Sequence, residues 1–193
     1  MVLTSSSMKL DLGALAPDFR LPDTSGREWT LADFGDAEAV LVAFICNHCP
    51  FVKHVRAGFA ELACDYVPRR VAVVGINSND FAAYPDDAPD RMREESFQAG
   101  YSFPYLVDET QQVAKDYGAA CTPDFFVFDR KRSLFYRGQM DDSRPGNDIA
   151  VDGADLRRAL DAALADRDAP ATQRPSVGCN IKWKPGNEPD YFG

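Results

Sequence analysis

The sequence predicts an α/β fold in which a central mixed sheet is flanked by helices. Two apolar runs, at residues 40–45 and 71–76, consist mostly of strand-forming residues and are typical of strands buried on both faces. Between them, residues 50–67 place apolar side chains at helical spacing, and Pro50 stands at the first helical position. A strand, a helix and a strand in this order predict a βαβ unit with parallel strands and a right-handed crossover.

The other elements follow in order along the chain. Residues 19–31 predict an N-terminal hairpin, because Asp, Thr, Ser and Gly at 23–26 supply the turn chemistry. After the βαβ unit, the patterns predict helices at about 89–99 and 109–117. Two strands follow, at 125–129 and 134–140, joined by a basic turn, and a last helix is predicted at 153–165.

The last segment, residues 168–193, differs from the rest because it is rich in proline and glycine. We expect an extended arm there rather than a second domain. A length of 193 residues also fits one domain. The predicted division is therefore an N-terminal extension at 1–12, one domain at 13–167, and an extended C-terminal arm of the same domain at 168–193.

Charge and hydropathy argue against several classes of partner. The chain has 21 Lys and Arg against 30 Asp and Glu, a net charge of −9, whereas nucleic acids and anionic membranes select a basic face. No apolar run approaches the roughly 18 residues of a spanning helix, and the N-terminus has no apolar signal region. We therefore expect a cytoplasmic protein with no nucleic-acid or membrane partner. No cofactor is expected.

Five cysteines carry most of the chemical information, namely Cys46, Cys49, Cys64, Cys121 and Cys179. In a reducing compartment such residues are thiols, metal ligands or catalytic groups rather than structural disulfides. The odd count also argues against a closed disulfide framework. Cys64 falls inside the predicted helix, so we expect a structural role for it.

Cys46 and Cys49 form a CxxC motif at the predicted strand-to-helix turn. Since Pro50 begins the helix, Cys49 is the expected N-cap residue, and its sulfur would face unpaired N–H groups at the positive end of the helix dipole. That environment lowers the pKa of a thiol and favours the attacking thiolate. Cys46 is close enough to resolve the resulting disulfide. The alternative is a pair of free thiols in a buried turn.

Five further residues are candidates around this motif. His48 lies between the two sulfurs and would stabilise a thiolate when protonated, with a solvated loop histidine as the alternative. Pro123 precedes a buried strand and can be cis, and its missing N–H exposes the backbone of Thr122 to a partner chain. Cys121 and Cys179 are possible accessory thiols, with a packed core thiol and an idle arm thiol as the respective alternatives.

Several stretches resemble one family. The Ala-Pro-Asp-Phe segment at 16–19, then a strand, the CxxC, a helix and a strand, and later Thr-Pro before a strand hairpin, are similar to a thioredoxin-fold redoxin. The resemblance is closest to a peroxiredoxin-like subfamily of the alkyl hydroperoxide reductase and thiol-specific antioxidant superfamily. It rests on CNHCPFVK, INSND, FPYLVDET, ACTPDFF, DDSRP and GCNIKWKPG and spans about residues 13–193. It implies a thioredoxin-like fold and a cis Pro123 beside the active site.

Two departures from the family pattern bear on the reaction. A thioredoxin places its first cysteine at the helix N-cap and its second a turn inside. This chain has Cys49 and Val52 at those positions, so the CxxC is shifted upstream and Cys49 is the expected attacking thiol. A peroxiredoxin carries a threonine three residues before its reactive cysteine, where this chain has Cys46, and an arginine where this chain has the 121–123 segment. A peroxidase without those two groups would be slow.

Three functions remain open. The first is a cytosolic thiol–disulfide oxidoreductase, in which Cys49 attacks a protein or small-molecule disulfide, Cys46 resolves it, and a cellular thiol reductant recycles the pair. The second is a weak thiol peroxidase, an antioxidant enzyme acting on peroxide through a Cys49 sulfenic acid. The third is a carrier of copper or zinc on Cys46, His48, Cys49 and Cys121, because thiolates and imidazole suit both metals. Whether the chain forms a homo-oligomer is also open.

Overall fold

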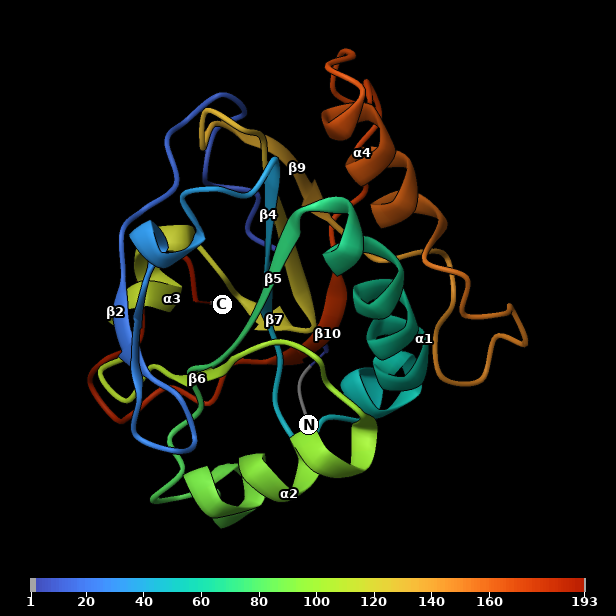
Figure 1. Cartoon of the computed structure of the whole chain (residues 1–193). Helices are drawn as coiled ribbons and strands as arrows, with labels where there is room; N and C mark the ends of the chain where they lie inside the picture. The colour runs from blue at the N-terminus through green and yellow to red at the C-terminus, as the bar shows by residue number, and fades with distance from the viewer. Residues whose placement is uncertain (1–2, 193) are drawn as a thin grey trace.

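A five-stranded sheet forms the centre of the molecule. The structure is a computed structural model and describes residues 3–192. The strands of the sheet, in the order β6-β5-β4-β8-β9 (Figure 1), are β4 (Ala39–Phe44), β5 (Val71–Asn77), β6 (Tyr105–Val107), β8 (Asp124–Phe128) and β9 (Leu134–Gly138). β4, β5 and β6 run parallel, while β8 pairs antiparallel with both β4 and β9. The predicted mixed sheet is confirmed.

Helices cover both faces of this sheet. They are α1 (Pro50–Tyr66), α2 (Pro89–Ala99), α3 (Gln112–Tyr117) and α4 (Ala154–Leu164), with short 3₁₀ turns at Leu31–Phe34, Val67–Arg69 and Pro85–Asp87. α1 and α4 pack on the face that carries Leu41 of β4, and α3 packs on the face that carries Val42. All six residues of β4 are buried, because successive side chains enter opposite cores. No helix within residues 3–192 is both long and apolar enough to cross a membrane.

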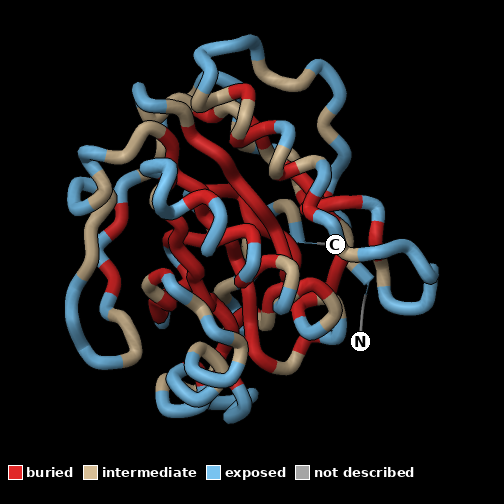
Figure 2. Tube along the Cα trace, turned by 45° about the vertical axis from the view of Figure 1, so that its right-hand side comes forward, coloured by how far each residue is buried: buried red, intermediate tan, exposed pale blue. Residues whose placement is uncertain are grey.

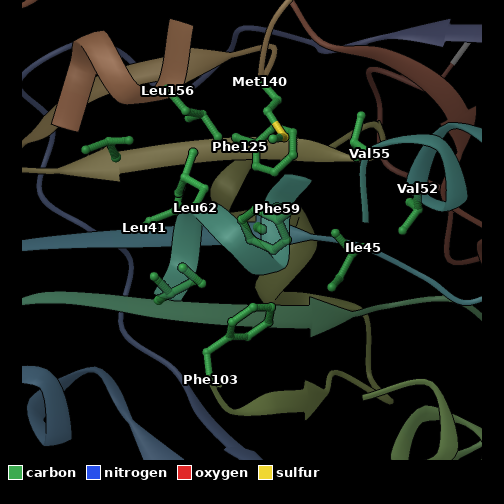
Figure 3. Close-up of a cluster of buried hydrophobic side chains, with 14 of the residues drawn as sticks. Leu41, Ile45, Val52, Val55, Phe59, Leu62, Phe103, Phe125, Met140 and Leu156 are labelled. Atoms are coloured by element: carbon green, nitrogen blue, oxygen red, sulfur yellow. The ribbon is translucent and has the colours of Figure 1, made fainter. Parts of the chain in front are cut away.

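Phe59 of α1 holds this helix on the sheet (Figure 3). Its ring packs against those of Phe103 and Phe125, with centroids 5.1 and 5.4 Å away, and it is 1% exposed. Since α1 begins at Pro50, this packing also fixes the residue that precedes the helix. The predicted βαβ unit of β4, α1 and β5 therefore sets where the CxxC motif lies.

The predicted N-terminal hairpin is also confirmed. β2 (Arg20–Pro22) and β3 (Glu28–Thr30) pair antiparallel. Asp23 builds the turn between them, because its Oδ1 accepts hydrogen bonds from the backbone N–H groups of Ser25 and Arg27 at 2.8 and 3.1 Å.

The ends of two predicted elements need correction. The helix expected at 109–117 begins only at Gln112, because Gln111 has a φ of 63° and its left-handed backbone does not continue a helix. The strand expected at 134–140 ends at Gly138, where the backbone φ of 144° requires a glycine.

Both ends of the chain join a second sheet that the sequence pattern does not indicate. β1 (Leu3–Ser5), β10 (Val177–Asn180) and β7 (Cys121–Thr122) form an antiparallel sheet in the order β1-β10-β7. Buried segments run through the centre of the molecule (Figure 2). In the second sheet, both residues of β7 and the two middle residues of β10 are buried, and Trp183 beyond β10 is only 8% exposed. We propose that the described parts of the two terminal segments, residues 3–12 and 168–192, are integral parts of the domain at 13–167.

Replacing Phe59 tests the packing that holds α1. We expect Phe59→Ala to lower the free energy of unfolding by about 3–5 kcal/mol, because it removes a buried ring and leaves a cavity. Phe97→Ala is the matched control, since Phe97 of α2 is 89% exposed, and it should change stability by less than about 0.5 kcal/mol. Urea denaturation measures both variants. A loss below about 1 kcal/mol for Phe59→Ala would contradict the packing.

Candidate active site

Cys49 is the N-cap residue of α1, as the sequence predicts. Its backbone is extended, with φ −69° and ψ 124°, and Pro50 is the first helical residue. Its sulfur turns toward the second sheet. It lies 3.1 Å from the carbonyl oxygen of Thr122 and 2.8 Å from the sulfur of Cys179. The fold therefore brings the arm cysteine, 130 positions away in the sequence, against the N-cap sulfur.

Two neighbouring thiols control the ionisation of Cys49. Hydrogen bonds from Cys179 and Cys46 lower the pKa of the Cys49 thiol, although its burial opposes the charge. The N–H of Val52 lowers this pKa further. The helix terminus therefore lowers the pKa of Cys49, as the sequence predicts. Its effect is smaller than that of the two neighbouring thiols, which the sequence analysis did not expect.

The same contacts act in the opposite sense on the two donors. The hydrogen bond to Cys49 raises the pKa of Cys179. Burial raises the pKa of Cys46, and the charge on Asp87 raises it further. The cluster therefore favours one thiolate, on Cys49, between two protonated thiols.

All three sulfurs are enclosed by protein. Cys49 is 0% exposed, Cys179 1% and Cys46 2%. Thr122 contacts both members of the CxxC motif, because its hydroxyl oxygen lies 3.3 Å from the Cys46 sulfur and its carbonyl oxygen approaches Cys49. A large substrate reaches Cys49 only after part of this cover moves.

The peptide bond between Thr122 and Pro123 is cis, as the family resemblance implies. The edge of Thr122 is not free for a partner chain, however, and this expectation is wrong for the conformation described. β10 pairs antiparallel with β7, with Cys179 opposite Thr122 and Asn180 opposite Cys121. The chain's own arm therefore occupies the edge.

The other two cysteines have different surroundings. The Cys121 sulfur contacts the carbonyl oxygen of Pro123 at 3.7 Å, and burial raises the pKa of this thiol. These features fit a packed core thiol. Cys64 lies at an exposed position of α1. It therefore contributes little to the core, although the sequence predicts a structural role for it.

A carboxylate that the sequence analysis missed orients His48. The Nδ1 atom of His48 lies 2.7 Å from Oδ2 of Asp87, and the imidazole stacks on Tyr84 with centroids 5.5 Å apart. Asp87 is buried and accepts hydrogen bonds from the Asn47 N–H and the Asn79 amide, both at 2.8 Å. Burial opposes the charge on Asp87, but these hydrogen bonds outweigh it and lower its pKa.

Asp87 also belongs to the one group of candidate metal ligands found among the described residues. Ligand atoms of Cys46, His48 and Asp87 lie within 4.8 Å of one another. This cluster shares only Cys46 and His48 with the predicted copper or zinc set, since Cys49 and Cys121 have other partners. One sequence signal could have found Asp87: its loop follows the carboxyl end of a parallel strand, where sites of α/β sheets gather.

A cavity of about 20 Å³ lies beside Pro123. Its lining includes Phe51 and His54 of α1, Pro123, Arg144 and Ser176. A cavity of this volume holds about one molecule of the size of water and is too small for a polypeptide strand.

Asp124 follows the cis proline and connects both chain termini to it. Its Oδ2 accepts a hydrogen bond from the Ser6 hydroxyl at 3.0 Å, and the residue is 0% exposed. Burial raises the pKa of Asp124 to about 7, although hydrogen bonds from Ser6 and Ser176 oppose the shift. The ionised carboxylate is therefore costly in the folded state.

Comparison with known proteins identifies one family and several relatives. Residues 12–137 match the AhpC/TSA family. The thiol-disulfide oxidoreductase ResA of Geobacillus thermodenitrificans is 27% identical over 119 residues, which are 62% of this chain and 64% of that protein. The putative peroxiredoxin bcp of Helicobacter pylori is 31% identical over 111 residues, which are 58% of this chain and 68% of that protein.

Solved structures agree with the fold. A hypothetical protein of Sinorhizobium meliloti is 55% identical, with a TM-score of 0.93 over 95% of this chain and 100% of that one. A thiol:disulfide interchange protein of the thioredoxin family from Chlorobium tepidum is 18% identical, with a TM-score of 0.63 over 80% of this chain and 98% of that one. The second similarity shows the fold alone, which is thioredoxin-like, as the sequence resemblance implies.

The raised pKa of Asp124 predicts a pH dependence of stability. An unfolded aspartate ionises near pH 4, whereas the folded Asp124 ionises at about pH 7. The contribution of this group to stability is therefore fully present below about pH 4 and is lost as the pH rises to about 7. We expect Asp124→Asn to remove this loss, which amounts to about 2–4 kcal/mol.

Denaturation of wild type and Asp124→Asn between pH 4 and 8 measures the effect. The exposed Asp168 supplies the control variant Asp168→Asn, which should keep the wild-type profile. An Asp124→Asn protein whose stability falls with pH as steeply as that of the wild type would refute the assignment.

Proposed function

The chain belongs to the AhpC/TSA family, and from this premise we propose that it is a cytoplasmic thiol–disulfide oxidoreductase with Cys49 as the attacking thiolate and Cys46 as the resolving thiol. Relatives named thiol-disulfide oxidoreductase and peroxiredoxin support redox chemistry as the function. The finer assignment depends on one observation. The N-cap sulfur of Cys49 lies 2.8 Å from the sulfur of Cys179, and its interactions with the thiols of Cys179 and Cys46 lower its pKa.

The proposed cycle moves two electrons from the protein to a substrate disulfide. The Cys49 thiolate attacks one substrate sulfur, a mixed disulfide forms, and the other substrate sulfur leaves as a thiolate that takes up a proton. Cys46 loses its proton and attacks the Cys49 sulfur, which releases the second substrate thiol and leaves a Cys46–Cys49 disulfide. A cellular thiol reductant then returns both sulfurs to the reduced state.

The different surroundings of the two cysteines support this division of roles. Cys49 has a lowered pKa, while burial and the nearby Asp87 charge raise the pKa of Cys46. A thiol that stays protonated does not compete for the substrate, because the thiolate is the nucleophile. Cys46 is therefore suited to the second step, and the hydroxyl of Thr122, 3.3 Å away, is placed to stabilise its sulfur.

A thiol peroxidase is the second candidate, and the cavity beside Pro123 favours it because a volume of about 20 Å³ suits a substrate as small as hydrogen peroxide. In this reaction the Cys49 thiolate attacks a peroxide oxygen, the O–O bond breaks, and a Cys49 sulfenic acid and an alcohol or water result. Condensation with the thiol of Cys46, Cys121 or Cys179 then gives a disulfide and water. Of these, Cys179 has its sulfur 2.8 Å from that of Cys49.

Metal binding is the third candidate, and the cluster of Cys46, His48 and Asp87 is the observation that favours it. Three internal hydrogen bonds already occupy the Asp87 oxygens, so this reading ranks below the redox ones. It requires about one copper or zinc ion per chain in the purified protein and its loss in Cys46→Ser. Metal analysis of both proteins decides it.

Cysteine substitutions test the proposed reaction. Cys49→Ser should lower the rate of reduction of a small aromatic disulfide at least about 100-fold, because it removes the nucleophile. Cys46→Ser should slow turnover by about tenfold, because only the second step is impaired. Cys64→Ser is the matched control at an exposed cysteine of α1 and should behave as wild type.

The rate of release of the coloured thiolate, with glutathione as reductant, measures all three variants. Full activity in Cys49→Ser would exclude the proposal. Peroxide consumption is recorded in the same preparations. Peroxide consumption that depends on Cys49, without disulfide reduction, would favour the peroxidase.

A further inference from the structure

We propose that β10 is a built-in substrate strand, which closes the active site by occupying the edge of Thr122 and presents Cys179 to Cys49 in the place of a substrate cysteine. The inference rests on the proposed function in one respect, that Cys49 is the reacting thiol. Beyond the proposed function, it makes Cys179 an internal partner of Cys49. It also means that β10 has to move before a polypeptide substrate can reach Cys49.

The backbone of β10 pairs with that of β7 as an added strand would. An extended chain that docks on an exposed strand edge binds through main-chain hydrogen bonds and places its side chains at fixed positions. β10 docks in this way on β7, with Cys179 directly opposite Thr122. Its sulfur then lies 2.8 Å from that of Cys49, where a substrate sulfur has to be for disulfide exchange.

The close approach is built into the sequence at Gly178. A Cβ atom at this position would overlap the carbonyl oxygen and carbon of Thr122. Glycine therefore permits a backbone contact that any other residue would prevent. This contact sets the depth at which the neighbouring Cys179 enters the site.

Contacts on both sides of β10 hold the strand in place. On one side, the Ser6 N–H donates to the carbonyl oxygen of Ser176 at 2.8 Å. On the other side, the Ile181 N–H donates to Ala120 at 3.1 Å, and the Asp80 N–H donates to the carbonyl oxygen of Lys182 at 2.8 Å. An external polypeptide therefore pairs with Thr122 only after a local opening of the 176–182 segment.

The internal reaction needs no additional oxidant. After the protein has reduced a substrate, the disulfide joins Cys46 and Cys49. Cys179 loses its proton and attacks the Cys49 sulfur, a Cys49–Cys179 bond forms, and Cys46 leaves as a thiolate that takes up the proton. The exchange conserves electrons, and it locks β10 covalently onto the first turn of α1. Reduction of this bond by a thiol reductant restores the cluster.

Gly178→Ala tests the closure, because the added methyl group pushes β10 off Thr122. With the reduced protein, a peptide carrying an activated mixed disulfide should react with Cys49 at least about tenfold faster in Gly178→Ala than in wild type. Peptide mapping identifies the modified cysteine. Glu188→Ala, at an exposed position of the arm, is the control and should react at the wild-type rate. Equal rates in folded Gly178→Ala and wild type would overturn the proposal.

A second measurement does not depend on the folding of that variant. Cys46→Ser is treated with a peptide disulfide and mapped by mass. We expect an intramolecular Cys49–Cys179 bond with release of the peptide, whereas the peptide should stay attached to Cys49 in Cys46→Ser/Cys179→Ser. Peptide that stays on Cys49 in Cys46→Ser alone would overturn the internal-partner role and leave the proposed function intact. Absence of any peptide on Cys49 in both variants would instead refute the proposed function.

Discussion

The contact between the sulfurs of Cys49 and Cys179, at 2.8 Å, depends on two surfaces that the fold holds in place. One is the first turn of α1, whose position follows from the packing of Phe59 on the sheet. The other is β10, which approaches β7 closely because residue 178 is glycine. This contact is the largest single cause of the lowered pKa of Cys49, and it brings Cys179 to the reacting sulfur.

Burial gives the cluster its chemical asymmetry. In water the cysteines would have similar pKa values, but in this cluster one sulfur accepts the hydrogen bonds and two donate them. A low-dielectric site strengthens such differences. The same burial limits access, so a reactive thiolate is combined with a closed surface. Once substrate reduction has left a Cys46–Cys49 disulfide, a protein of this kind exchanges that bond with its own third thiol before a bulky partner reaches it.

The sequence pattern was sufficient to predict the elements that have their own periodicity or capping residues. The apolar runs of β4 and β5, the helix starting at Pro50 and Cys49 as its N-cap all agree with the structure. β7 and β10 have only 2 and 4 residues, and pairing with each other rather than local propensity makes them strands. Asp87 lies in a Pro-rich loop whose place beside His48 depends on the whole sheet. The closed Thr122 edge escaped sequence analysis for the same reason.

A redox titration with cysteine mapping tests the central claim most directly. The protein is equilibrated in glutathione buffers of graded potential, free thiols are alkylated, and all five cysteines are mapped by peptide mass. We expect every intramolecular disulfide to contain Cys49, joined to Cys46 or to Cys179, and we expect Cys64 and Cys121 to be alkylated as free thiols. If Cys49 stays reduced across the whole series, it is not the reacting thiol.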